Sequence, residues 1–134
     1  MKELNTLNLP DDVRYTQDHE WAQKSGSNIR IGISDYAQDQ LGDIVFVELP
    51  QIGSSFDHGQ PCGTIESVKA VSEMYMPISG EVVTVNADLE GTPELLNKAP
   101  YDKGWMFEVK PSKPAEFDQL LDKKAYFELL KGQK

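Results

Sequence analysis

Metal-binding and disulfide-forming residues are scarce in this sequence. Its 134 residues include one cysteine, Cys62, and two histidines, His19 and His58, which lie 39 positions apart. A single cysteine cannot form an internal disulfide, and no Cys-x-x-Cys pair is present to hold zinc. With no third ligand at a suitable spacing, we expect no metal site. Cys62 also lacks a neighbouring histidine or basic cluster that would lower its thiol pKa, so we expect a buried structural thiol.

Long apolar runs and an excess of positive charge are missing too. The longest uninterrupted apolar run, residues 44–47, is far shorter than the ~20 residues of a membrane-spanning helix. The 13 Lys and Arg residues against 22 Asp and Glu give a formal net charge of -9, which repels phosphate backbones and anionic membranes. We therefore expect neither nucleic acid nor a membrane as a partner. Residues 1–5 lack the hydrophobic core of a signal peptide, which predicts a cytoplasmic location.

The rest of the composition is that of a folded domain. Apolar residues make up 39% of the chain, and no linker or low-complexity stretch divides it. A length of 134 residues fits one domain of ordinary size. We predict a single domain over residues 1–134, with its core over residues 15–110 and a helical region over residues 114–131.

Local patterns predict mainly short strands with helices at the periphery. Alternating segments at 20–23 and 28–33, joined by a loop with Gly and Ser at 24–27, predict an antiparallel hairpin. Ser34 is expected to cap a short helix that Gly42 ends. The further expected elements are a strand over 43–49, an extended stretch over 61–76, a helix over 92–97 capped by Thr92, a strand over 105–109, and helices after Pro114.

A short internal repeat, called the echo below, links two of these segments. Residues 42–47, Gly-Asp-Ile-Val-Phe-Val, match residues 80–85, Gly-Glu-Val-Val-Thr-Val, at an offset of 38 positions. Each copy has an apolar face that it cannot bury alone, so we expect two similar β units packed about a pseudo-two-fold axis. Chance similarity between two strand-like hexamers is the alternative. The residues alone thus predict a β barrel or sandwich with peripheral helices.

Lys69 lies where the extended stretch over 61–76 is expected to reverse. If Val68 and Lys69 are the central turn residues, Ser67 faces Ala70 and the strands hold the lysine rigidly while its amine stays accessible. By the same register, Glu66 faces Val71. The turn lacks the Asn-Gly or Asp-Gly pair that tight hairpins favour. From composition alone, a lysine at such a turn is more often a solubilising charge than a functional group.

Several segments resemble the H protein family of the glycine cleavage system. The lysine segment, Glu-Ser-Val-Lys-Ala-Val-Ser-Glu at residues 66–73 with Pro-Ile-Ser-Gly-Glu-Val-Val at 77–83, is similar to the family's lipoyl attachment region. Further signatures occur in the family's order at residues 18–21, 31–35, 41–50 and 100–106. The resemblance spans residues 15–109, and its ordered signatures outweigh the interpretation of Lys69 as a solubilising charge.

The resemblance implies a fold and a function. The fold is the barrel-sandwich hybrid of biotinyl and lipoyl carriers, mainly β, with two quasi-symmetric halves that agree with the echo. The resemblance implies that Lys69 carries lipoic acid in amide linkage and that the chain is a carrier rather than an enzyme. Its arm would visit glycine decarboxylase with pyridoxal phosphate, aminomethyltransferase with tetrahydrofolate, and dihydrolipoyl dehydrogenase in turn. A monomer is expected.

The resemblance also assigns places to two acids. Glu20 matches a family glutamate that lines the cleft for the loaded arm, and Glu73 matches an acid beside the lysine hairpin. We expect Glu66 and Glu73 to present the lysine to a lipoyl ligase or transferase rather than to take part in bond making. One position departs from the family pattern, because many members have histidine near Gln40. That departure bears on the contacts between arm and cleft.

Other functions compete with this hypothesis. A biotin carrier usually has Met-Lys-Met at the lysine and a 2-oxoacid dehydrogenase lipoyl domain Asp-Lys-Ala, whereas this chain has Val68-Lys69-Ala70. A lipoyl relay protein, which supplies lipoate to other enzymes, is an alternative that these residues leave open. A hydrolase or transferase lacks support, because no Gly-x-Ser-x-Gly, Gly-rich phosphate loop or clustered His and acid pair is present.

Overall fold

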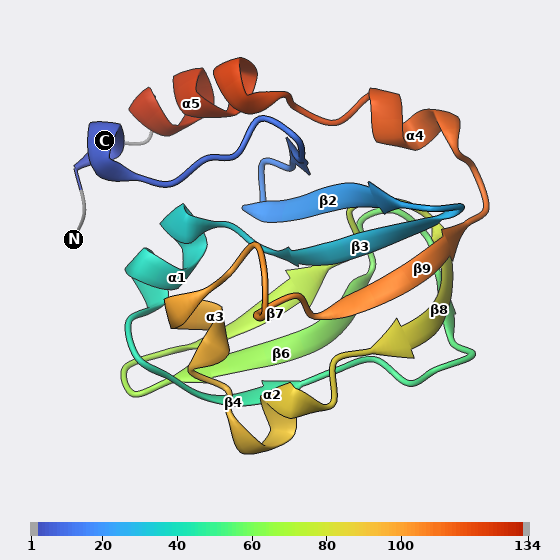
Figure 1. Cartoon of the computed structure of the whole chain (residues 1–134), viewed down its shortest axis with the longest axis horizontal. Coiled ribbons are helices and arrows are strands. Elements are labelled where there is room, and N and C mark those ends of the chain that lie inside the picture. Colours follow the sequence, from blue (N-terminus) through green and yellow to red (C-terminus); the bar gives the residue numbers. More distant parts are fainter. Residues whose placement is uncertain (1–2, 133–134) are drawn as a thin grey trace.

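Two antiparallel sheets form the body of the protein in a computed structural model that describes residues 3–132 (Figure 1). The six-stranded sheet has the order β1-β2-β3-β9-β8-β5, and the three-stranded sheet has the order β4-β6-β7. The principal hydrophobic cluster draws on both sheets, with members such as Ile31, Ile65 and Val82. Alternating inward side chains therefore bury one face of each sheet against the other.

The first hairpin confirms the predicted antiparallel pair but has a shorter loop. Strand β2 (Glu20–Ser25) pairs with β3 (Asn28–Ile33), so Lys24 and Ser25 lie in the strand rather than in the loop. Only Gly26 and Ser27 connect the strands, and Gly26 has φ +64°. A two-residue turn needs such a positive φ, which glycine adopts without steric cost.

Helix α1 (Asp35–Leu41) begins and ends where the sequence predicted. The Ser34 hydroxyl accepts a hydrogen bond from the Ala37 backbone N–H at 3.2 Å, which satisfies one amide of the first turn. Gly42 ends the helix with φ +79°, a conformation that side-chain-bearing residues rarely adopt. The helix leads directly into β4 (Ile44–Glu48), within the predicted strand over 43–49.

The extended stretch over 61–76 forms the second hairpin. Strand β6 (Pro61–Ser67) pairs with β7 (Val71–Tyr75) on one side and with β4 on the other. The second copy of the echo forms β8 (Gly80–Val85), which lies in the six-stranded sheet between β5 (Ser55–Phe56) and β9 (Phe107–Pro111). The two copies of the echo thus lie in different sheets.

Two expected elements start later than predicted, and α2 (Asp88–Gly91) lies in a segment for which no helix was expected. Thr92 does not cap a helix over 92–97, because it instead ends α2, and α3 (Leu95–Lys98) begins after it. The final strand, β9, covers Phe107–Pro111 rather than 105–109. Asn86 explains part of this shift, because its side-chain amide donates to the carbonyl of Trp105 at 2.7 Å and holds that residue outside the sheet ladder.

The C-terminal region is helical, as predicted, and it packs on the N-terminal segment. Pro114 precedes α4 (Ala115–Asp118), and Asp122 caps α5 (Lys123–Lys131). Tyr126 of α5 stacks on Tyr15 with 4.5 Å between ring centroids. This contact belongs to a second hydrophobic cluster, which lies over the strand pair formed by β1 (Arg14–Tyr15) and β2; its buried members are Leu9, Val13, Tyr15, Trp21, Tyr126 and Leu130. The short helix η1 (Leu4–Thr6) packs beside α5 (Figure 1).

Candidate functional site

Lys69 lies at the tip of the β6–β7 hairpin, at one end of the molecule (Figure 1). The register pairs Glu66 with Val71, and the Ser67 backbone N–H donates to the Ala70 carbonyl at 2.8 Å, so the predicted turn is confirmed. Lys69 is exposed, and its ammonium forms no ion pair with the described residues. An accessible primary amine therefore projects from a turn of defined geometry.

The Ser67 hydroxyl holds this turn. Its oxygen accepts hydrogen bonds from the backbone N–H groups of Lys69 at 3.3 Å and Ala70 at 3.1 Å. Among the described non-glycine residues only His19 has a positive φ, so this is not the turn type that needs Asn-Gly. Serine hydroxyls stabilise turns by bonding amides a few residues on. This role of Ser67 was not predicted, although a serine directly before a turn is its signal.

The hairpin tip is also tied to the body of the protein. The Val68 backbone N–H donates to the Asp43 carbonyl at 3.0 Å. Asn97 of α3 fixes both neighbours of Asp43, because its oxygen accepts from the Ile44 backbone N–H and its amide donates to the Gly42 carbonyl, each at 2.9 Å. The segment around Asp43 thus contacts the turn directly, and α3 supports that segment from behind. No local sequence signal marks Asn97 for this role.

We expect Ser67→Ala to loosen the turn without unfolding the protein. Removing one hydroxyl that bonds partly exposed amides is expected to lower the free energy of unfolding by about 1 kcal/mol. Hydrogen exchange at the Lys69 and Ala70 amides should become faster, while exchange in β6 stays close to wild type. Ser55→Ala, at an exposed strand position, is the matched control. Unchanged exchange at Lys69 and Ala70 would show that the hydroxyl does not hold the turn.

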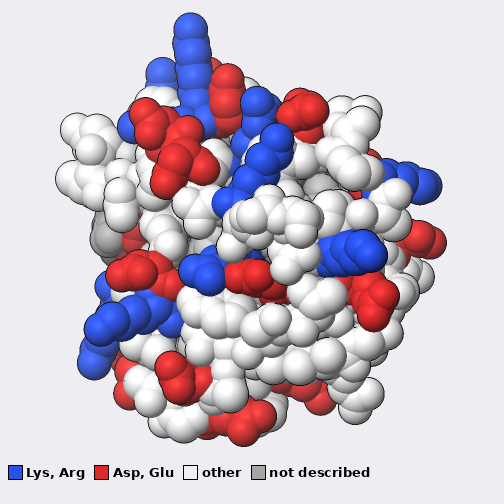
Figure 2. All heavy atoms as spheres, turned by 45° about the vertical axis from the view of Figure 1, so that its right-hand side comes forward, with Lys and Arg blue, Asp and Glu red and all other residues white. Residues whose placement is uncertain are grey.

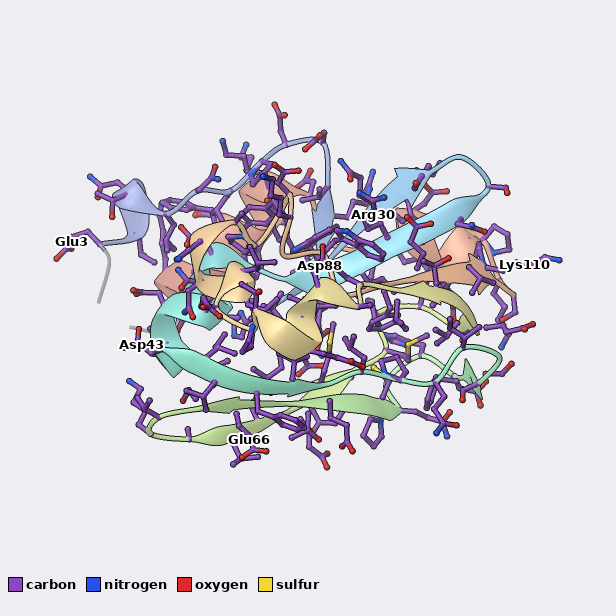
Figure 3. The ribbon with its side chains drawn as sticks, turned by 60° about the horizontal axis from the view of Figure 1, so that its bottom comes forward. Glu3, Arg30, Asp43, Glu66, Asp88 and Lys110 are labelled. Atoms are coloured by element: carbon purple, nitrogen blue, oxygen red, sulfur yellow. The ribbon has the colours of Figure 1, made fainter. Side chains whose placement is uncertain are left out.

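The two acids expected to present the lysine lie on the outer face of the three-stranded sheet. Glu66 is half-buried on β6, and Glu73 is exposed on β7. Glu66 points away from the protein on this face (Figure 3). Within residues 3–132, neither carboxylate forms an ion pair with Lys69. The structure thus places both acids near the turn without direct contact to the amine.

Glu20 lies apart from the lysine, at the start of β2. It is 2% exposed, and its carboxylate oxygens accept hydrogen bonds from the Thr16 hydroxyl at 2.7 Å and the Tyr75 backbone N–H at 3.1 Å. Burial raises the Glu20 pKa from 4.5 to about 7, and these hydrogen bonds oppose the rise only in part. Tyr75 is at the other end of β7 from Lys69, so β7 connects the amine and this carboxylate.

A pocket of about 250 Å³ opens beside Glu20. Asp18 and Met76 line it together with residues from the C-terminal region, such as Leu121 and Leu129. His58 also lines this pocket.

The single cysteine is buried in the core. Cys62 is 7% exposed, and burial raises the pKa of its thiol to about 12. The prediction of a buried structural thiol is confirmed.

Neither a metal cluster nor a membrane-spanning helix occurs in the residues that the structure describes. In the part of the chain that the structure describes, no group of three His, Cys, Asp or Glu residues could hold a metal ion. Over residues 3–132, no helix has the length and apolar character needed to cross a membrane. On the face turned forward in Figure 2, Lys and Arg side chains lie among Asp and Glu, with no large basic patch.

Comparison with known proteins identifies the family. Residues 13–133 match the family described as Glycine cleavage H-protein. The glycine cleavage system H protein of Geobacillus kaustophilus is 54% identical over 90% of this chain and 94% of its own length. That of Anoxybacillus flavithermus is 49% identical over 92% of this chain and 98% of its own length.

A solved structure agrees with the fold. The crystal structure of a glycine cleavage system H protein from Mycobacterium marinum has a TM-score of 0.83 and 35% sequence identity, over 92% of this chain and 99% of that chain. The expected barrel-sandwich fold is confirmed. The relatives are named for glycine cleavage, which does not favour the lipoyl relay alternative. The chain therefore belongs to the glycine cleavage H-protein family, the lipoyl carriers of the glycine cleavage system.

Proposed function

We propose that Lys69 carries lipoic acid in amide linkage and that the chain is the non-catalytic carrier component of a glycine cleavage system. The observation that supports this most directly is the exposed amine of Lys69 on a turn held by Ser67 and by the Asp43 carbonyl. A rigid turn presents one lysine in one position, so a modifying enzyme can distinguish it from the other surface lysines. In this proposal the chain is a single domain, functions as a monomer and is located in the cytoplasm.

Lipoyl attachment converts the Lys69 amine into an amide. The lysine stem passes Gly42, where a Cβ would lie 3.5 Å from the Lys69 Cε, an ordinary van der Waals distance. Attachment requires lipoate activated with ATP as an acyl adenylate. The Nζ lone pair attacks the acyl carbon, a C–N bond forms, the C–O bond to adenylate breaks, and the amine loses a proton. The charged amine becomes a neutral amide, which is easier to bring into a partner's buried site.

When bound, the group would supply a strained disulfide that can be opened to carry the aminomethyl group of glycine from glycine decarboxylase. At aminomethyltransferase the one-carbon unit would pass to tetrahydrofolate with release of ammonia, and dihydrolipoyl dehydrogenase would reoxidise the remaining dithiol. The chain itself needs no nucleophile for this cycle. Its own residues hold the stem at the hairpin tip and leave it accessible to each enzyme. Glu66 and Glu73 present the lysine to the lipoyl ligase or transferase.

We assign Glu20 to the cleft that receives the loaded arm. A carboxyl with a pKa of about 7 exists in both protonation states near neutral pH. A cationic amine placed beside it would favour the ionised form, because an opposite charge lowers a carboxyl pKa. The pocket beside Glu20 is partly closed by the C-terminal region, which would limit water access to the cargo. Glu20 therefore acts as a binding residue that holds an ammonium group.

Replacing both Glu66 and Glu73 with glutamine is expected to slow lipoylation without destabilising the fold. Changes at surface acids usually alter the free energy of unfolding by no more than about 0.5 kcal/mol. The melting temperature should therefore stay close to wild type while the initial rate of modification falls. The control is the double glutamine variant of two other exposed acids, Glu81 on β8 and Glu94 directly before α3. A large loss of stability with a normal rate of lipoylation would contradict the assignment.

Peptide-resolved mass spectrometry tests the attachment itself. The purified chain is incubated with lipoate, ATP and a lipoate ligase, digested, and mapped. We expect one lipoyl group per chain, on the peptide that contains Lys69. A lipoyl group on another lysine, or none at all, would overturn the proposal.

A further inference from the structure

The outer face of the three-stranded sheet carries an apolar patch beside Lys69. Phe46 of β4 is 50% exposed, and Val68 and Val71 at the hairpin are 71% and 67% exposed. Phe46 is paired with Glu66, and Glu66 is paired with Val71, so these three side chains form one row across the sheet. Val45, at the bulge in β4, is 52% exposed. We call Val45, Phe46, Val68 and Val71 the hairpin patch.

Acidic side chains lie within and around the hairpin patch. Asp43 lies at the end of the molecule that carries the hairpin turn, and Glu66 projects from the outer face (Figure 3). The next row across the sheet places Glu48, Thr64 and Glu73 together. Between residues 40 and 75 the only Lys or Arg is Lys69 itself. A complementary partner surface would therefore combine apolar contacts to the patch with Lys and Arg side chains placed opposite Glu66 and the neighbouring acids.

The length of the lysine side chain indicates which partner enzyme must contact the protein surface beside Lys69. An unmodified lysine extends only about 6 Å from its Cα, so the enzyme that acylates it must bring its active site against the hairpin. The attached acyl group more than doubles this reach, so the enzymes that use the arm can act with less contact around the turn. The modifying enzyme therefore needs a docking surface directly beside Lys69 more than the enzymes that use the arm do.

We propose that the hairpin patch is the docking surface for the enzyme that attaches the lipoyl group to Lys69. This inference rests on the proposed attachment at Lys69. The exposed apolar side chains of the patch, Phe46 and Val71 at the two ends of the row and Val68 at the turn, contact apolar surface of the lipoate ligase or transferase. The surrounding carboxylates pair with its Lys and Arg side chains and guide it to the tip of the hairpin.

The test compares initial rates of lipoylation for the wild-type apo chain and for Phe46→Thr and Val71→Thr, with purified lipoate ligase, lipoate and ATP. Threonine suits a strand, so both variants keep a compatible backbone while removing apolar surface. Each is expected to raise KM for the apo chain roughly tenfold with little change in kcat, because the lost contact is made in the initial complex. Phe46→Leu, which stays apolar, should remain within about threefold of wild type.

Ile52→Thr is the matched control. Ile52 is 63% exposed but lies in the loop after β4, which runs toward the opposite end of the sheet from the hairpin turn (Figure 1). Its KM should equal that of wild type. Thermal unfolding of every variant shows whether the fold is kept, and a KM increase in a stably folded Phe46→Thr or Val71→Thr chain supports the proposal.

Equal KM values for wild type, Phe46→Thr and Val71→Thr would overturn the docking surface even if Lys69 is lipoylated in all of them. An equal rise in KM for Ile52→Thr would also overturn it, because general apolar loss would then explain the effect. Failure of the proposed attachment gives a different result, since the wild-type chain would then gain no lipoyl group at Lys69.

Discussion

A Lys69→Arg chain is expected to fold normally and to accept no lipoyl group. Arginine keeps the positive charge and the length of the exposed side chain, so the turn held by Ser67 should be unaffected. Its guanidinium has no primary amine that can form the amide. The mass of the variant should stay unchanged after incubation with ligase, lipoate and ATP, and its melting temperature should match that of wild type.

Lys103→Arg is the control for this experiment. Lys103 is another exposed turn lysine, and its replacement should leave one lipoyl group per chain. The Lys69→Arg chain should also fail to support glycine cleavage when it replaces wild type in the reconstituted system. Lipoylation that persists in Lys69→Arg would require a different attachment lysine.

The second large effect concerns the pH dependence of stability and Glu20. Below its ordinary pKa of 4.5, this carboxyl is protonated in both folded and unfolded chains, so burial has no ionisation penalty. Between pH 4.5 and about 7 the unfolded chain releases the proton, whereas burial keeps the folded chain protonated until the pH reaches about 7. The free energy of unfolding therefore falls, by an amount on the order of 3 kcal/mol for this group.

Glu20→Gln should remove this contribution. Glutamine keeps the shape of the side chain and an oxygen that accepts hydrogen bonds, but it does not ionise. Urea unfolding measured from pH 4 to pH 8 should show that the variant loses less stability than wild type as the pH rises. Glu81→Gln, at an exposed strand position, is the matched control. Parallel pH profiles for wild type and Glu20→Gln would show that burial does not raise this pKa.

Elements with local signals could be predicted from the sequence. Ser34 and Gly42 mark the two ends of α1. The first turn of the helix needs a side-chain acceptor for its free amides, and the residue after the helix needs a positive φ. The hairpin register around Lys69 followed from the alternation of side chains along two neighbouring strands. In both cases the interactions that decide the structure are only a few residues apart.

Features that depend on distant residues could not be predicted. Asn97 holds Gly42 and Ile44 from more than fifty positions away, and nothing in its own neighbourhood indicates this. The Tyr126 hydroxyl lies 2.8 Å from the Ser34 hydroxyl and 2.9 Å from His19 Nδ1, so the C-terminal helix contributes to the region beside Glu20. The strand alternation identifies Glu20 as part of β2, but its raised pKa depends on burial, which the alternation alone does not reveal.

Transfer of the methylene carbon of glycine tests the central claim most directly. The lipoylated chain is combined with glycine decarboxylase, aminomethyltransferase, tetrahydrofolate, dihydrolipoyl dehydrogenase and glycine labelled at that carbon. We predict that label enters the one-carbon unit on tetrahydrofolate only when the lipoylated chain is present, and that the unmodified chain supports no transfer. A lipoylated chain that supports no transfer while all three enzymes are active with another H protein would contradict the carrier function.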